Sequence, residues 1–129
     1  SNWDVSSVTD MDFIFMDATS FNSDLSKWDV SSVTNMNYVF MRATLFNGDL
    51  SKWDVSSVTS MNFLFSGATS FHGELSKWCV SSARDMAGMF SEASFNGDIS
   101  KWDVSSVKKM YNINNTKFFL VHRAYLSSF

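Results

Sequence analysis

Residues 28–33 read Trp-Asp-Val-Ser-Ser-Val, and the same six letters stand at residues 3–8, 53–58 and 102–107. A variant of them, Trp-Cys-Val-Ser-Ser-Ala, stands at residues 78–83. Successive copies begin 25, 25, 25 and 24 residues apart. A period of this size indicates a repeat protein, in which each unit buries its apolar face by stacking on the next one. We therefore divide residues 1–112 into five units, which start at residues 3, 28, 53, 78 and 102.

The second unit predicts one short helix and one short strand. Four of its apolar residues follow one another at steps of three, four and three, the spacing of one helical face: Val33, Met36, Phe40 and Ala43. A short extended run follows at Leu50, Trp53 and Val55. The second serine of each pair is the expected helix cap, because serine accepts hydrogen bonds from the free N–H groups of a first turn: Ser7, Ser32, Ser57, Ser82 and Ser106.

The predicted fold class is an α/β solenoid of about five strand–helix units, each about 25 residues long. Stacked parallel strands lie about 4.8 Å apart, whereas packed helices need about 8 to 10 Å. The stack should therefore curve, with the strands on the concave side.

Three apolar positions recur along the units and are predicted to form rows in the core rather than a cofactor site. The rows are Phe15, Phe40, Phe65 and Phe90; Phe21, Phe46, Phe71 and Phe95; and Met11, Met36, Met61, Met86 and Met110. The tryptophans are assigned to packing as well, because they are identical in all five units. Each indole N–H is expected to bond a carbonyl group of the next unit.

Composition limits the classes of function. The 129 residues fit one elongated domain, and the net charge of −3 gives no general basic surface for nucleic acid. The longest apolar runs are too short to span a membrane. A single cysteine, Cys79, cannot form an internal disulfide.

The amino-acid pattern of the unit resembles that of a known family. Trp-Asp-Val-Ser-Ser-Val-Thr-Asn-Met at 28–36, followed by Phe-Asn-Gly-Asp-Leu-Ser-Lys-Trp at 46–53, is similar to the repeat of about 26 residues in the BspA-like leucine-rich-repeat surface proteins, also called the DUF285 or Mycoplasma lipoprotein-type family. The resemblance covers residues 3 to 112. The sequence departs from it at Cys79, at Ala83-Arg84, in a one-residue deletion between Ala93 and Phe95, and after Met110.

The resemblance implies a right-handed, leucine-rich-repeat-like solenoid in a surface or secreted protein. It also implies a non-enzymatic adhesion or protein-interaction module without a cofactor. An extracellular or cell-surface location is the expectation from the family, with an organelle-associated complex as the alternative. Our alternative function is a structural accessory subunit docked on a larger, organellar or membrane, assembly; ice or glycan binding ranks third.

Two polar rows are candidates for a contact surface on the concave side. The interaction candidates alternate in charge, and each acidic residue stands three positions before a lysine: Asp24, Lys27, Asp49, Lys52, Glu74, Lys77, Asp98 and Lys101.

The aspartates that follow the tryptophans are expected to accept hydrogen bonds from the Val-Ser-Ser turn and to stay ionised. A weak calcium ladder is the other interpretation of that row: Asp4, Asp29, Asp54 and Asp103.

The two ends of the chain suggest a protein partner. Residues 113–129 leave the repeat pattern and form either a C-terminal cap or a partner-docking tail, with exposed candidates Phe118, Phe119, Tyr125 and Phe129. The first unit lacks its own Phe-Asn-Gly-Asp-Leu-Ser lead-in, so its open edge is expected to be covered by an earlier unit or by another protein. The oligomeric state is left open.

No catalytic group is predicted. His72 and His122 lie outside any equivalent repeat position, and no nucleophile motif, phosphate loop or zinc-ligand spacing occurs. His72 replaces a turn asparagine and is read as a solvated turn residue.

Overall fold

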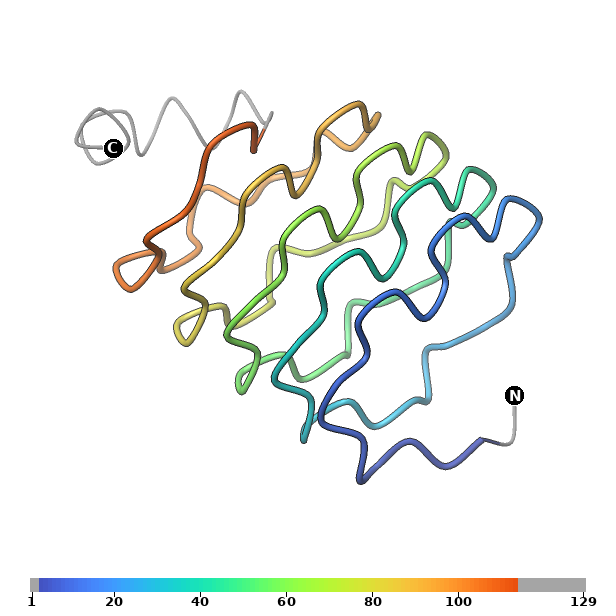
Figure 1. The fold of residues 1–129 in the computed structure, drawn as a ribbon, viewed down its shortest axis with the longest axis horizontal. Coiled ribbons are helices and arrows are strands. Elements are labelled where there is room, and N and C mark those ends of the chain that lie inside the picture. The colour runs from blue at the N-terminus through green and yellow to red at the C-terminus, as the bar shows by residue number, and fades with distance from the viewer. Residues whose placement is uncertain (1–2, 114–129) are drawn as a thin grey trace.

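The computed structural model describes residues 3–113, which form a stack of coils (Figure 1). Each repeat unit makes one coil, at residues 3–27, 28–52, 53–77 and 78–101, and residues 102–113 begin a fifth. Neighbouring coils run parallel and in register, because single β-bridges join equivalent residues. These bridges pass in turn through Asp10, Asn35, Ser60, Asp85 and Lys109. The two ends of the described chain therefore lie at opposite ends of the stack (Figure 1).

Residues 3–113 contain no helix, and their only β-structure is the isolated bridges. The predicted α/β solenoid of leucine-rich-repeat-like strand–helix units is therefore wrong. Between its bridge and the Phe-Asn segment, each coil consists of consecutive turns. Many apolar side chains of these turns, such as those of Phe40 and Ala43, are still buried in the stack.

The hydrogen bonds of residues 36–43 explain why no helix forms. The N–H groups of Met36, Tyr38, Phe40 and Arg42 donate to carbonyl groups of the following coil, at 2.9, 2.9, 2.9 and 2.7 Å. Met41 and Ala43 donate to the carbonyl groups three residues back. A helix would direct every N–H to the carbonyl four residues back. Here alternate N–H groups join one coil to the next, those of Met41 and Ala43 close local turns, and that of Asn37 donates to Asp12 Oδ1 of the preceding coil.

Left-handed backbone positions complete this pattern. Each of the first four coils has two residues with positive φ. The pairs are Phe13 (68°) and Asp17 (63°), Tyr38 (63°) and Arg42 (57°), Phe63 (55°) and Gly67 (69°), and Gly88 (61°) and Glu92 (57°). Such a residue cannot belong to a right-handed helix, and it costs about 1–2 kcal/mol where the residue is not glycine. Cross-coil hydrogen bonds made by these residues, such as those of Tyr38 and Arg42, hold them in place.

The predicted core rows are confirmed, although the elements that carry them are not. Phe40, Phe65 and Phe90 are fully buried, and their rings stack at centroid distances of 5.6 and 5.7 Å. All five methionines of the third row are buried as well: Met11, Met36, Met61, Met86 and Met110. The exceptions lie in the first coil, where Phe15 and Phe21 are only partly buried. Consecutive three-residue turns return a side chain to the interior about as often as a helix does, so the spacing alone did not distinguish the two.

The predicted curvature is also wrong in its cause, because residues 3–113 contain no helices that would require a wider spacing. Phe40 and Phe65 lie 5.6 Å apart, and Phe46 and Phe71, further along the coil, lie 6.0 Å apart. These two adjacent phenylalanine rows therefore repeat at nearly the same distance. No concave face arises from a mismatch between strands and helices.

The serine pairs form tight turns instead of helix caps. Val33 N–H donates to the carbonyl oxygen of Val30 at 3.0 Å, which closes the turn around Ser31 and Ser32. The first serine, not the second, makes the side-chain contact, with the carboxylate of Asp29. The helix-cap assignment of Ser7, Ser32, Ser57, Ser82 and Ser106 is therefore wrong.

Candidate functional site

The tryptophans join the coils through their indole groups. Trp53, Trp78 and Trp102 donate their Nε1–H to the carbonyl oxygens of Leu25, Leu50 and Leu75, at 3.0, 2.9 and 3.0 Å. The same leucine carbonyls also accept the main-chain N–H of the tryptophan three residues later. The packing role is thus confirmed for these three residues, but the acceptor lies 28, 28 and 27 residues earlier in the chain and not in the next unit.

The aspartate row after the tryptophans behaves as expected. Asp54 Oδ1 accepts hydrogen bonds from the main-chain N–H of Ser56 at 3.0 Å and from its hydroxyl at 2.6 Å. The hydroxyl of Ser56, and then its N–H, hold the pKa of Asp54 below the ordinary value. The same contacts recur for Asp4, Asp29 and Asp103. The row's carboxylates are therefore engaged by serines of their own turns.

Cys79 occupies the same position in the fourth coil. Its sulfur lies 3.3 Å from the hydroxyl oxygen of Ser81, and this contact lowers the pKa of the thiol. Within residues 3–113, no three His, Cys, Asp or Glu side chains gather in a way that could hold a metal ion. Calcium binding by Asp4, Asp29, Asp54 and Asp103 stays a prediction.

The second acidic row uses its carboxylates in the same way. Asp24, Asp49, Glu74 and Asp98 each accept the main-chain N–H of the serine two residues later. For Asp49, the hydroxyl of Ser51 is the largest cause of the lowered pKa, and the charge of Lys52 contributes less. Lys27, Lys52, Lys77 and Lys101 are exposed beside this row. The predicted surface thus lies on the outside of the stack, while Phe118, Phe119, Tyr125 and Phe129 lie outside the described residues.

Asparagine ladders, which the sequence reasoning missed, tie neighbouring coils together. Asn37 Oδ1 accepts the N–H of Asn62 at 2.9 Å, and Asn62 Oδ1 accepts the N–H of Ala87 at 2.8 Å. A second ladder connects Asn47 Oδ1 with the N–H of His72 at 2.8 Å. These side chains satisfy backbone donors of the next coil, so we assign them to register rather than to ligand binding.

A partly exposed aromatic row is the most distinctive feature of the outer surface. The rings of Phe13, Tyr38 and Phe63 stack nearly parallel, at centroid distances of 4.9 and 5.5 Å. Phe13 is 53% exposed, and the other two are half-buried. The row ends on Gly88, where an added Cβ would lie 2.2 Å from the ring of Phe63. We call Phe13, Tyr38 and Phe63 the aromatic row.

An ion pair flanks the aromatic row. Arg42 and Asp17 each stand four residues after a ring of the row, and the guanidinium Nη2 lies 3.0 Å from Asp17 Oδ2. The hydrogen bond from Arg42 lowers the pKa of Asp17. Both side chains are about half exposed, at 51% and 50%, so this pair contributes little to stability. The pair places one positive and one negative side chain close to the aromatic row.

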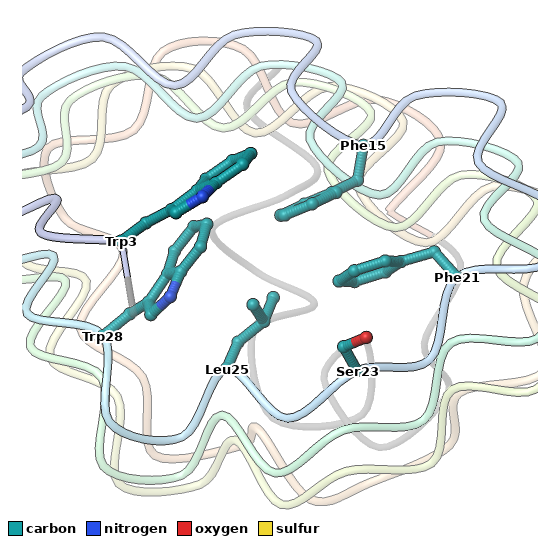
Figure 2. Close-up of a pocket in the computed structure, with 6 residues that line it drawn as sticks. All are labelled: Trp3, Phe15, Phe21, Ser23, Leu25 and Trp28. Carbon is teal, nitrogen blue, oxygen red and sulfur yellow. The ribbon is translucent and has the colours of Figure 1, made fainter. Parts of the chain in front are cut away.

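The N-terminal end of the stack contains a cavity of about 150 Å³. Figure 2 shows the side chains that line it pointing into the interior of the first coils: Trp3, Phe15, Phe21, Ser23, Leu25 and Trp28. Phe15 and Leu25 enter it from opposite sides (Figure 2). The cavity is apolar apart from the serine hydroxyl and the indole groups.

Residues 3–113 contain no helix, and therefore none that is long and apolar enough to cross a membrane.

Comparison with known proteins gives one family. No curated protein and no solved structure matches the chain. A family model described as a Mycoplasma protein of unknown function, DUF285, matches residues 1–94 and again residues 46–120. The coils that carry the Trp-Asp-Val-Ser-Ser-Val turns lie within these matches. The chain therefore belongs to the DUF285 family.

Proposed function

We propose that this chain is a non-enzymatic protein-interaction module that binds its partner through the aromatic row. The observation that carries the proposal is the stack of Phe13, Tyr38 and Phe63 on the outer surface, while the other phenylalanine rows of the central coils are buried. Aromatic side chains are enriched among the residues that dominate binding energy at protein interfaces. Adhesion by a surface or secreted protein is the biological setting that we propose for it.

The backbone at the aromatic row supports this choice. Phe13, Tyr38 and Phe63 have φ values of 68°, 63° and 55°, and the equivalent position in the fourth coil is Gly88. Glycine is the residue that accepts this conformation without strain. Backbone strain alone would favour glycine at all four positions. Aromatic residues at three of them are consistent with a second requirement, such as contact with a partner.

The stack also prepares the rings for binding. Each ring is held against its neighbour, so little side-chain freedom is lost when a partner covers it. The pair of Arg42 and Asp17 beside the row offers a donor and an acceptor at the rim. An apolar strip with a polar rim is the usual arrangement of a protein interface.

Photo-crosslinking identifies the partner and the face together. A photoreactive phenylalanine analogue replaces Tyr38 in one preparation and Lys52 in the other. We expect stoichiometric capture of one protein from position 38 only. Capture of the same protein from position 52 instead would move the interface to the acidic and basic rows.

Affinity measurements with the purified partner then test the row directly. The double variant Tyr38→Ser with Phe63→Ser should bind at least about 30-fold more weakly, because a central aromatic contact contributes about 2 kcal/mol or more. The matched control is Lys27→Ser with Lys52→Ser, which should bind as the parent does. Equal affinities of the parent and the aromatic variant in calorimetry would rule out this interface.

The accessory-subunit alternative is tested in the same purification. A subunit of a larger assembly would be recovered in fixed stoichiometry with several other chains, whereas an interaction module should be recovered alone and bind one partner reversibly.

A further inference from the structure

The side of the stack that carries the aromatic row changes its charge from coil to coil. Segments 10–17, 35–42, 60–67 and 85–92 lie side by side on it, joined by the β-bridges (Figure 1). The charged residues of these segments and of the fifth bridge position are all at least partly exposed. In chain order they are Asp10, Asp12 and Asp17; Arg42; Asp85 and Glu92; and Lys109. We call the four segments, together with Lys109, the bridge face.

The charges of the bridge face are complementary to the same charges taken in reverse order. At the bridge position, Asp10 lies at one end of the stack and Lys109 at the other. Arg42 and Glu92 also occupy equivalent positions, with the uncharged Gly67 between them. The third coil has no charged residue between residues 60 and 67. Reversing the order of the coils therefore places opposite charges against each other on both sides of a neutral centre.

Twofold symmetry produces this reversal. In a symmetric dimer, the same patch of both copies forms the interface. With the axis along the third coil, the first coil faces the fifth coil of the second copy, and the second coil faces its fourth. Asp10 then lies against Lys109, and Arg42 lies against Glu92. Asp85 lies against Asn35, whose amide group can donate to a carboxylate.

The centre of the same arrangement is apolar. Phe63 meets its own counterpart at the axis, and Tyr38 lies beside it in the aromatic row, with 5.5 Å between the ring centroids. Gly67 has no side chain, so the backbone of the third coil can be approached closely there. An apolar centre with a charged rim is the usual arrangement of a protein interface.

We propose that the bridge face binds a second copy of this chain, antiparallel about a twofold axis along the third coil. The inference rests on the proposed function, which puts the interface at the aromatic row, and it adds the identity of the partner. Charge complementarity selects the partner of an interface. A face that is complementary to itself when reversed therefore selects its own copy.

Sedimentation velocity of the full chain measures the self-association, with a reductant present because Cys79 is exposed. The parent should form a dimer as its concentration is raised to the millimolar range, and the dimer should weaken with salt. Arg42→Glu should weaken it by about 10-fold or more, because symmetry repeats the repulsion against Glu92 twice. Lys52→Glu, the matched charge reversal outside the bridge face, should associate as the parent does.

Mixing two variants tests the pairing itself. Arg42→Glu has a glutamate at both positions, and Glu92→Arg has an arginine at both, so each variant alone should be mainly monomeric. An equimolar mixture should form a heterodimer about as stable as the parent dimer, because each contact between positions 42 and 92 again joins opposite charges. Mixing would not restore a dimer that was lost through local misfolding.

The outcomes separate this inference from the proposed function. A parent chain that stays monomeric, or single variants that mixing does not restore, would overturn the antiparallel dimer. A different protein captured from position 38 would then leave the aromatic row as the interface. A dimer that persists unchanged in Tyr38→Ser with Phe63→Ser would lie on another surface and would also overturn the inference.

Discussion

The first coil, residues 3–27, and the third coil, residues 53–77, have closely related sequences but differ in how well their apolar side chains are covered. Ile14 is 41% exposed, whereas the equivalent Leu64 is fully buried. Trp3 is 69% exposed, and Trp53 is 4% exposed. The third coil has a neighbour on each side, while the described chain gives the first coil only one (Figure 1).

This comparison shows that burial in the stack comes from the neighbouring coil more than from the coil itself. Residues 3–113 have no helix that could hold together alone, and most turns donate alternate N–H groups to the next coil. Stability should therefore be close to a sum of contacts between neighbours, as in other repeat proteins. Equivalent substitutions in the first and third coils should then have different effects.

The largest expected difference comes from the inner phenylalanine row. Phe65 is fully buried against Phe40, Phe71, Phe90 and Trp78, so Phe65→Ala should lower the free energy of unfolding by about 3–5 kcal/mol. Phe15→Ala, in the partly covered first coil, should cost about half as much. Urea denaturation followed by tryptophan fluorescence measures both values. Equal losses would mean that the first coil is as well packed as the third.

A smaller difference is expected between two tryptophans that lose the same volume. Trp53→Phe removes a hydrogen bond to Leu25, whereas Trp28→Phe removes a buried donor that has no acceptor. The free energy of unfolding should therefore fall by about 1–3 kcal/mol more for Trp53→Phe than for Trp28→Phe. The same denaturation experiment gives this difference. A larger loss for Trp28→Phe would show that its indole already has a partner in solution.

The sequence predicted the repeat period and the buried positions, but not the backbone conformation and hydrogen bonds of the coil. The period, the buried rows such as Phe40 and Met36, and the turn between Asp29 and Ser31 all follow from residue types at fixed spacing. The helix was wrong because steps of three and four residues suit consecutive turns as well as a helix. The deciding hydrogen bonds join residues about 24 positions apart, such as Met36 and Ser60, and leave no local signal.

The candidate site was missed for a related reason. In the helical interpretation, Tyr38 lies off the buried face and has no assigned role, whereas in the structure it belongs to the exposed aromatic row. A signal was available: Gly67 and Gly88 occupy the same repeat positions as Arg42 and Tyr38. Glycine at a repeated position marks backbone that helices do not contain. The acidic and basic rows, by contrast, were placed on the surface correctly, but the concave side expected for them depended on helices that residues 3–113 do not contain.

The pH dependence of stability should reflect the aspartate turns. The pKa of Asp54 is lowered by its hydrogen bonds from Ser56, relative to an ordinary value of 3.8. A carboxylate whose pKa is lowered on folding stabilises the fold above pH of about 4, and this contribution is lost as the pH falls through the lowered pKa. Asp54→Ala should therefore reduce stability at pH 7 and lessen its fall below pH 4. Parallel curves for parent and variant between pH 2 and pH 7 would contradict this assignment.

The smallest effect is expected at Lys52, which is exposed between the second and third coils. The carboxylate of Asp49 is engaged mainly by the hydroxyl and N–H of Ser51, so the loss of the lysine leaves its principal contacts intact. Lys52→Ala should change the free energy of unfolding by no more than about 0.5 kcal/mol. Lys27→Ala should change it as little, because solvent screens an exposed charge whether or not its coil is fully covered. Unequal effects at these two lysines in the same denaturation assay would mean that the polar rows, and not only the apolar interior, distinguish the first coil from the coils behind it.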